Sequence, residues 1–541
     1  MSENTQPSLG KSSFLLGSGT LVSRVLGFIR MMMLALVLGI VGSVGADTFA
    51  VANQLPNNLH VLIAGGVVAA TLVPAIVRSA LHADGGAAYV NKLLTLALIA
   101  FTAITLIATL LAPVLVSLYA AGWSSEQLAL ATAFAYWCLP QLFFYGLYTV
   151  LGEVLNARGV FGPFTWAPVL NNIIGIAGIA AFALMFGVQG TDVRLIVDWT
   201  PEMIAVLAGT ATAGVAAQAL ILLVSWRKLG LRYRPDFIWR GVGLRDTGRI
   251  VGWTFGMLVM TQLGGIVQTN VVALASGEGA SVFTMSTAWL IFMLPHSLIA
   301  VSMGTVYFTR MSSAAEHGPS LELATLTSQA LRQIGLLLVW SAAALCAAAF
   351  PLAGLFTADP ESKSALGSLI MFLAFGLPAF SAMYVMFRVF LAIGQARLLF
   401  AANAFQVGLF VIIAFLAAML PVKLIALGVS AALAGSTIIA AVITFAVMKT
   451  RLPQLEVRPI VMTTIRSYIA GIIAAVFGLA AAALLGVFSA AGFAGTNFIT
   501  NIIAGIAIAA VVTLIYVVVL FFMKTRELQD VIGLVRSKLG R

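Results

Sequence analysis

The stretch Phe498–Met523 reads FITNIIAGIAIAAVVTLIYVVVLFFM and contains no Asp, Glu, Lys or Arg. A helix that crosses a bilayer needs about 20 consecutive, mostly apolar residues. Over that length only a helix satisfies all of its backbone hydrogen bonds inside lipid. We therefore predict that this stretch spans a membrane as a single α-helix.

Similar apolar runs occur along the whole chain, without the alternation that is typical of strands. The predicted spans are 13–41, 46–78, 92–120, 127–157, 162–188, 201–226, 248–276, 281–309, 325–357, 364–394, 397–420, 422–448, 464–489 and 498–523. The sequence therefore predicts an all-α polytopic membrane protein with about 14 transmembrane helices.

The composition excludes several classes of protein. Of the 541 residues, 61% are hydrophobic and 9% are charged, whereas a soluble domain has roughly 45–50% apolar and about 25% charged residues. A soluble enzyme, a nucleic-acid-binding module and a disordered chain are all excluded. We interpret the net charge of +11 as an excess of Lys and Arg on the cytoplasmic side of a membrane.

The distribution of basic residues predicts the orientation of the chain. If the N-terminus is cytoplasmic, only Arg194, Lys363 and Lys423 fall in outer loops, and the densest basic cluster, 227–249, falls in an inner loop. Cytoplasmic loops of membrane proteins carry such an excess. Both termini are therefore predicted to be cytoplasmic.

Four Leu-Pro pairs inside predicted spans indicate an internal repeat. Pro56 and Pro140 are 84 residues apart, and Pro295 and Pro378 are 83 apart. A duplication of six helices gives two lobes of the same orientation, and we expect the prolines to bend their helices for structural or gating purposes. The predicted division is a tail (1–12), a first lobe (13–226), a basic connector (227–247), a second lobe (248–448), two last helices (449–523) and a basic tail (524–541).

Two arginines, Arg24 and Arg30, lie inside the first predicted span, which contains no acidic residue. An arginine at the bilayer centre costs at least about 2.5–3.5 kcal/mol. We expect both to face a wet cavity and to bind an anion, because a guanidinium recognises phosphate or carboxylate through paired hydrogen bonds. The alternative is an ion pair with another helix.

Further candidate residues lie near these arginines or at the ends of spans. We place Ser23, Asn57 and His60 with the substrate-binding residues, although His60 could be a hydrogen-bonded core residue. Asp47 is either an outer gate contact or a carboxylate at a helix N-terminus. Asn171 is expected to bridge two helices by a hydrogen bond.

The sequence lacks the motifs of common catalytic and metal sites. Gly10-Lys11-Ser12 resembles the end of a Walker A motif but lacks its leading glycine. Cys138 and Cys346 are isolated, so we interpret them as packing residues and predict no metal site. No cofactor is predicted, and coupling to the membrane potential or to an ion gradient stays open.

Three segments resemble motifs of the MurJ (MviN) family. Ser23–Arg30 (SRVLGFIR) and Asp47–Asn57 (DTFAVANQLPN) are similar to its S-R-V-L-G-F-x-R and D-x-F-x-V-A-x-x-L-P-N motifs. Residues 155–171 are similar to its L-N-x-x-G-x-F…A-P-V-L-x-N signature. The resemblance covers essentially the whole chain.

This resemblance implies a flippase of the MOP exporter superfamily in the bacterial cytoplasmic membrane. Such a protein moves lipid II, the polyprenyl-pyrophosphate-linked peptidoglycan precursor, from the inner to the outer leaflet by alternating access. The resemblance further implies that the arginines hold the pyrophosphate, the cavity takes the sugars and the peptide, and the last two helices form a groove for the polyprenyl tail. Expected partners are lipid II, membrane lipids and the cell-wall synthesis machinery, with no nucleic acid.

The chain departs from many family members at several charged positions. It has Met31, His60, Leu290 and Met293 where acidic or basic residues are common, so Arg24 and Arg30 are expected to be the main pair. The nearest alternative is another MOP exporter, either a polysaccharide-lipid flippase or a multidrug antiporter. A drug antiporter would offer a buried carboxylate, and a membrane glycosyltransferase would need catalytic acids.

Overall fold

The computed structural model describes residues 9–63, 86–188, 194–226, 233–237, 248–316, 318–489, 492–493 and 497–529. These residues form helices joined by short loops, with no strand among them. Thirteen helical segments of the described chain are long and apolar enough to cross a membrane, and two of them, Ser125–Ala157 and Val282–Ala314, consist of consecutive shorter helices. The helix α2 (Val44–Ile63) belongs to a further predicted span, 46–78, whose second half lies outside the described residues. The predicted all-α polytopic class is confirmed.

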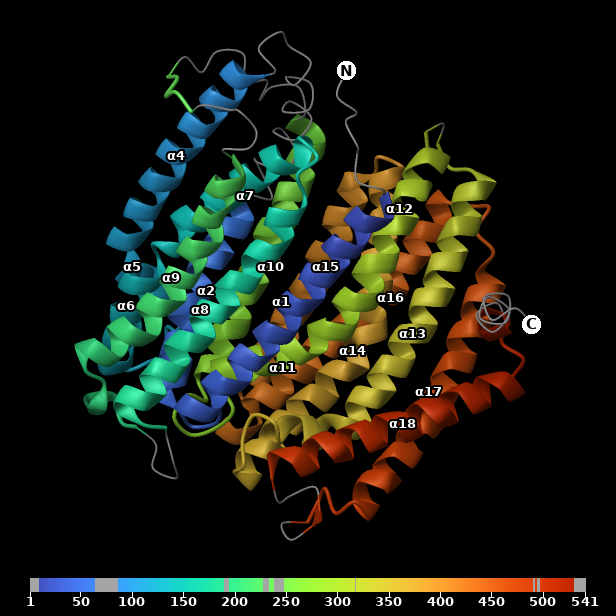
Figure 1. Ribbon diagram of the computed structural model, residues 1–541. Coiled ribbons are helices and arrows are strands. Elements are labelled where there is room, and N and C mark those ends of the chain that lie inside the picture. Colours follow the sequence, from blue (N-terminus) through green and yellow to red (C-terminus); the bar gives the residue numbers. More distant parts are fainter. Residues whose placement is uncertain are drawn as a thin grey trace. The chain divides into compact units, whose positions relative to one another are not determined.

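The chain divides by its contacts into two compact units, 1–262 and 263–541. In the first unit, α1 packs along α8, α8 along α9, and α7 against both α4 and α9 (Figure 1). Its elements are α1 (Leu9–Leu38), α2, α4 (Ala87–Leu110), α5 (Ala112–Tyr119), α6 (Ser125–Cys138), α7 (Gln141–Ala157), α8 (Gly162–Phe186), the short η2 (Ile196–Asp198) and α9 (Pro201–Trp226). The boundary between the units falls within α10 (Gly248–Ala273).

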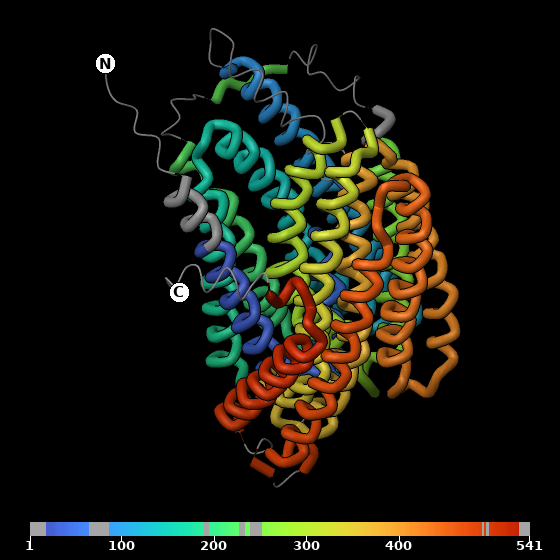
Figure 2. The backbone as a smooth tube through the Cα atoms, turned by 90° about the vertical axis from the view of Figure 1, so that its right-hand side faces the viewer, coloured from blue at the N-terminus to red at the C-terminus, as the bar shows by residue number. Residues whose placement is uncertain are grey.

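The second unit is arranged around α13, which packs against α14, α17 and α18. Figure 2 shows α17 and α18 as the adjacent orange and red helices of the C-terminal region. The elements are α11 (Val282–Pro295), the π-helical η4 (His296–Val301), α12 (Ser302–Ala314), α13 (Leu321–Ala353), α14 (Pro360–Ala392), α15 (Ala396–Ala417), α16 (Val422–Arg451), α17 (Val457–Leu484) and α18 (Phe498–Phe522).

The four matched prolines do not have the same effect on their helices. Pro140 lies at the junction of α6 and α7, and Pro295 ends α11 just before the π-helical turn. Pro56 and Pro378 lie inside helices that continue past them. Proline removes one backbone donor from a helix, and neighbouring helices decide whether the helix breaks or continues.

The predicted connector, 227–247, is described only at 233–237. There Tyr233 and Thr95 share a hydrogen bond between their hydroxyls (3.0 Å), and the Arg234 amide donates to the Asn91 side chain (3.2 Å). This segment is thereby tied to α4. The predicted division of the chain into lobes and tails stays a prediction.

Small residues allow the last helices to approach α13 closely. The core shared by α13, α17 and α18 contains Ala347, Ala474 and Ala504, and a Cβ at Gly478 would lie 2.7 Å from that of Ala347. Close packing of small side chains stabilises helix pairs in lipid, where no hydrophobic effect acts between helices. By contrast, large apolar side chains such as Leu184, 88% exposed, cover the outer surface, as expected of helices in contact with lipid.

Candidate functional site

Arg24 and Arg30 both project from α1, the helix that packs along α8. Neither forms an ion pair with a carboxylate among the described residues. The Nη1 atom of Arg24 is buried without a hydrogen-bond partner. This arrangement disfavours the ion-pair alternative for both side chains within the described part of the chain.

Arg30 occupies a narrow space between α1, α8 and α9. A cavity of about 10 Å³ remains beside it, lined mainly by Leu34, Phe49, Ile179 and Leu207. That volume is close to the minimum for a single water molecule. The guanidinium is therefore packed in mostly apolar surroundings with space for little more than one water. The wet, anion-binding cavity expected at both arginines stays a prediction.

Gly175 on α8 makes this position of Arg30 sterically possible. A Cβ built on Gly175 would lie 2.6 Å from Nε and 2.8 Å from Cζ of Arg30. These distances are well inside van der Waals contact, so any other residue at position 175 would have to displace the guanidinium. The backbone of α8 thus serves as a wall for the charged group.

Ser23 contributes to the contact between α1 and α8 mainly through its backbone carbonyl. Asn172 on α8 donates from Nδ2 to the Ser23 carbonyl oxygen (2.8 Å) and, over 3.4 Å, to its hydroxyl. A Cβ on Gly27 would meet the same Asn172 amide at 3.7 Å. The Asn172 side chain therefore fixes α1 against α8 directly before Arg24.

Asn171 bridges a different pair of helices. Its Nδ2 donates to Oε1 of Gln218 on α9 (2.8 Å), and a Cβ on Gly214 would lie 2.6 Å from its Oδ1. Hydrogen bonds of this kind stabilise helix association in membranes. Asn171 therefore acts between α8 and α9, while its neighbour Asn172 acts between α8 and α1.

His60 is packed inside the first unit against α7 and α4. Its Nε2 and the Thr149 hydroxyl lie 3.1 Å apart, and its ring centroid is 5.6 Å from that of Tyr145 and 6.3 Å from that of Phe101. The Nδ1 atom is buried without a partner. His60 is therefore a packed and hydrogen-bonded residue of the first unit.

A polar network that the sequence analysis missed joins α2, α7 and α9. Gln141 donates from Nε2 to Oδ1 of Asn53 (3.0 Å) and to the Thr212 hydroxyl (3.1 Å). The Tyr145 hydroxyl donates weakly to Oε1 of Gln141 (3.5 Å). The available signal was an amide directly after Pro140 in the middle of an apolar span.

Asn57 and Asp47 lie apart from this network. The Asn57 side chain is exposed, whereas its neighbour Asn58 donates to the Tyr119 hydroxyl (3.2 Å) and accepts from Gln262 through its carbonyl (2.6 Å). Asp47 is 2% exposed in the first turn of α2, a place where the helix dipole stabilises a carboxylate. Its proposed role as a gate stays a prediction.

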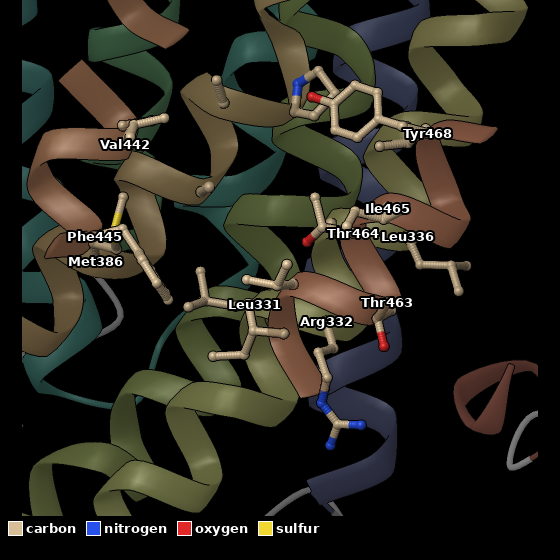
Figure 3. Close-up of a pocket in the computed structure, with 18 residues that line it drawn as sticks. Leu331, Arg332, Leu336, Met386, Val442, Phe445, Thr463, Thr464, Ile465 and Tyr468 are labelled. Carbon is tan, nitrogen blue, oxygen red and sulfur yellow. The ribbon is translucent and has the colours of Figure 1, made fainter. Parts of the chain in front are cut away.

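The second unit contains an apolar crevice of about 360 Å³ between α13, α14, α16 and α17 (Figure 3). Met386 on its floor is 1% exposed, whereas Val442 and Ile465 on its rim are 66% and 48% exposed. Figure 3 places Tyr468 at one end and Arg332 at the other. The volume is in the range of small-molecule pockets, and all four helices are candidate membrane spans, so a hydrocarbon chain fits this crevice.

Arg332 at the end of the crevice is already neutralised. It forms an ion pair with Glu527, which follows α18, and the Thr463 hydroxyl on α17 donates to the same carboxylate over 3.2 Å. Further along, the Tyr516 hydroxyl donates to the Leu336 carbonyl oxygen over 2.8 Å. These contacts tie α17 and α18 to α13.

A family model and individual relatives resemble this chain. The sequence model described as lipid II flippase MurJ matches residues 35–503. A probable lipid II flippase MurJ of Rhizobium meliloti is 28% identical over 388 residues, which cover 69% of this chain and 68% of that protein. A lipid II flippase MurJ of Burkholderia cenocepacia is 29% identical over 342 residues, covering 62% of this chain and 63% of that protein.

Solved structures share the fold. A lipid II flippase MurJ in an inward closed conformation superimposes with a TM-score of 0.71 at 18% identity, covering 93% of this chain and 98% of that one. An inward-facing multidrug resistance MATE transporter of the MOP superfamily superimposes with a TM-score of 0.62 at 19% identity, covering 80% of this chain and 95% of that one. At these identities the match describes the fold alone.

Proposed function

The chain belongs to the MurJ family of lipid II flippases, which are transporters rather than enzymes, and we propose that Arg24 and Arg30 bind the pyrophosphate of its cargo. It is a multi-pass protein of the bacterial inner membrane that translocates lipid II from the inner to the outer leaflet for cell-wall synthesis. The multidrug-antiporter and polysaccharide-flippase alternatives are not favoured, because the matched family is that of lipid II flippases.

The observation that carries the assignment of Arg30 is its packing without a carboxylate. A charge in apolar surroundings is unfavourable unless a partner compensates it. The pyrophosphate of lipid II is proposed to supply that partner in a conformation of the transport cycle that opens the space beside Arg30, and a guanidinium can bind two of its oxygens at once. Arg24, with a buried nitrogen that lacks an acceptor, offers a second contact on the same helix.

The neighbouring polar residues are proposed to bind or position the rest of the headgroup. The exposed Asn57 side chain offers an amide for the sugars or the peptide. Ser23 acts through the hydrogen bond that orients α1. His60, bonded to Thr149 and packed near Tyr145, is proposed to support the substrate site from within the first unit.

The polyprenyl tail is proposed to use the crevice of the second unit. Its lining is mostly apolar, and its rim side chains on α16 and α17 are exposed. The family resemblance implied a tail groove formed by both final helices. The crevice is lined by residues of α17 and by none of α18, so the proposed tail site uses only one of these two helices. A crevice of about 360 Å³ takes part of a long tail while the remainder stays in the bilayer.

Transport is proposed to need no cofactor and to follow alternating access of the two six-helix lobes, with both termini in the cytoplasm. An inside-negative potential supplies about 2.3 kcal/mol per charge per 100 mV, and it favours outward movement of an anionic headgroup. An ion gradient is the alternative source. Flipping that persists after the potential is collapsed, with pH and sodium gradients preserved, would contradict potential-driven transport.

Contact of this protein with the cell-wall synthesis machinery is also a proposal.

The deciding experiment is rescue of a bacterium depleted of its own flippase, with lipid II in the outer leaflet measured directly. We expect the intact chain to restore both growth and outer-leaflet lipid II. The matched control is the Arg24→Ala/Arg30→Ala double variant at equal membrane abundance, which should restore neither. Growth without any gain in outer-leaflet lipid II would contradict the proposed function.

A further inference from the structure

Arg388, four residues before the end of α14, is held between aromatic rings. Its Cζ lies 4.8 Å from the centroid of Phe308 on α12 and 5.0 Å from that of Tyr384. One of its terminal nitrogens donates to the Tyr384 hydroxyl over 2.8 Å. Stacking and this hydrogen bond together fix the plane of the guanidinium.

The ring that orients Arg388 is itself fixed. A Cβ on Gly304 would lie 2.7 Å from Cε1 of Tyr384, so the ring is packed against the α12 backbone. Tyr384 also contacts His296, whose ring stands edge-on to the tyrosine ring with the two centroids 5.5 Å apart. The Nδ1 atom of His296 lies 2.9 Å from the hydroxyl of buried Ser381. His296 opens the π-helical turn η4, a feature that is frequent at functional sites.

Most of the binding capacity of Arg388 is unused. A guanidinium has five N–H donors, and among the described residues its hydrogen-bond acceptor is the Tyr384 hydroxyl. Arg388 forms no ion pair with a carboxylate there. Its free nitrogens are not among the buried atoms without a partner, so they are accessible to a ligand. A purely structural cation–π contact does not account for these accessible donors.

The adjacent face of α12 is polar as well. Ser302, Thr305 and Thr309 are all exposed, and at 100° per residue they fall within about 60° of one another around the helix. Phe308, which stacks on Arg388, borders this face. Each hydroxyl donates its hydrogen to a backbone carbonyl, over 3.4 Å from Ser302, 2.8 Å from Thr305 and 3.3 Å from Thr309. The donors to a phosphate therefore come from Arg388, and the hydroxyls make its surroundings more polar than hydrocarbon.

The geometry points to Arg388 as a binding site for the phosphate group of a lipid, beside the polar face of α12. Two lipids carry this chemistry: lipid II, through its pyrophosphate, and anionic phospholipids, through their headgroups. The lipid II source rests on the proposed function and would give the second unit its own contact with the cargo. The phospholipid source does not depend on it.

The test uses the full-length protein in nanodiscs and has two arms. One arm titrates lipid II into nanodiscs of zwitterionic lipid, and the other measures retention of phosphatidylglycerol without lipid II. Arg388→Gln should weaken binding about ten- to a hundredfold, as for loss of a charge-assisted contact. Arg388→Lys should be intermediate, since it keeps the charge but loses the paired donors. The control is Arg310→Gln, an exposed arginine of α12, which should change binding less than twofold.

Tyr384→Phe keeps the ring and removes the hydroxyl that orients Arg388. This variant keeps the inference testable even if the Arg388 variants fail to fold. It should weaken binding severalfold with an unchanged melting temperature. A loss in the lipid II arm assigns the site to the cargo, and a loss confined to the phosphatidylglycerol arm assigns it to a phospholipid. If wild type does not bind lipid II but binds phosphatidylglycerol through Arg388, the proposed function fails and this inference stands. Equal binding by Arg388→Gln and Arg310→Gln in both arms overturns it.

Discussion

Asn172 on α8 donates a 2.8 Å hydrogen bond to the backbone carbonyl of Ser23, the residue before Arg24. Within a helix that carbonyl also serves the α1 backbone, so the amide adds a second, interhelical bond. It fixes the rotation of α1 about its own axis at the level of Arg24. The directions in which Arg24 and Arg30 project therefore depend on a residue that carries no charge.

Loss of this hydrogen bond should impair cargo binding more than folding. We expect Asn172→Ala to weaken lipid II binding severalfold, because an interhelical hydrogen bond in a membrane contributes about 0.6–2 kcal/mol. The matched control is Asn171→Ala, which loses the bond to Gln218 and should mainly lower the melting temperature. Equal effects of the two variants on lipid II affinity would contradict a positioning role for Asn172.

The two arginines should be needed individually. We expect Arg24→Ala and Arg30→Ala each to reduce lipid II affinity about ten- to a hundredfold, the loss of one charge-assisted contact of roughly 1.5–3 kcal/mol. Rescue of the depleted bacterium should fail at normal membrane abundance. Arg24→Lys should rescue only weakly, because an ammonium cannot bind two phosphate oxygens in parallel. Near-normal lipid II binding by both alanine variants would return the arginines to a structural role.

Gly175→Ala should weaken lipid II binding without lowering the thermal stability of the protein. The new methyl group would displace the Arg30 guanidinium, whose Nε lies 2.6 Å from the position of that Cβ. The displaced group is the end of a long side chain, so the helix itself is not strained, and replacing a helical glycine can stabilise by about 0.4–1 kcal/mol. We expect weaker lipid II binding with an equal or higher melting temperature.

Gly162→Ala is the control for this variant. Gly162 begins the same helix and has no atom near the position of its Cβ. It should leave lipid II binding unchanged. Unchanged binding by Gly175→Ala as well would show that the exact position of the Arg30 guanidinium does not matter.

His60→Ala should do less harm than either arginine variant. Its ring is bonded to Thr149 and packed near Tyr145, and a neutral imidazole contributes little to anion binding. We expect a melting temperature lowered by a few degrees and partial rescue, measured against Thr149→Val, which removes the same hydrogen bond. A loss of lipid II affinity as large as that of Arg30→Ala would make His60 a direct ligand.

The Arg332–Glu527 ion pair should stabilise the C-terminal helices. The two side chains are 21% and 7% exposed, so removing one partner leaves the other poorly solvated, and breaking a buried pair costs about 3–5 kcal/mol. Because Arg332 is partly exposed, we expect Glu527→Ala to fall at or below the lower end of that range. The Arg332→Met/Glu527→Leu double variant should recover stability in thermal unfolding. A double variant less stable than Glu527→Ala would exclude this account.

The sequence was sufficient for the membrane class, because an uncharged stretch such as Phe498–Met523 has few physical interpretations. It also singled out Arg24 and Arg30 as charges inside a span, and their role stays a prediction. The sequence was not sufficient to predict the hydrogen-bond partners of Gln141 and Tyr145. A polar residue in a span indicates that a partner exists, but the partner comes from a helix far away in the sequence. The same limit applies to Pro140 and Pro378, whose different effects depend on the helices around them.

Gly175 also constrains how this protein can evolve. A single-base change of a glycine codon that exchanges the amino acid always introduces a larger residue, and the smallest of these, alanine, already intrudes on Arg30. Because such a change leaves the helix intact, selection for folding would not remove it, whereas selection for transport would. A lineage could therefore replace Gly175 only after its flippase had stopped relying on Arg30, and the order of these two substitutions would record when that reliance ended.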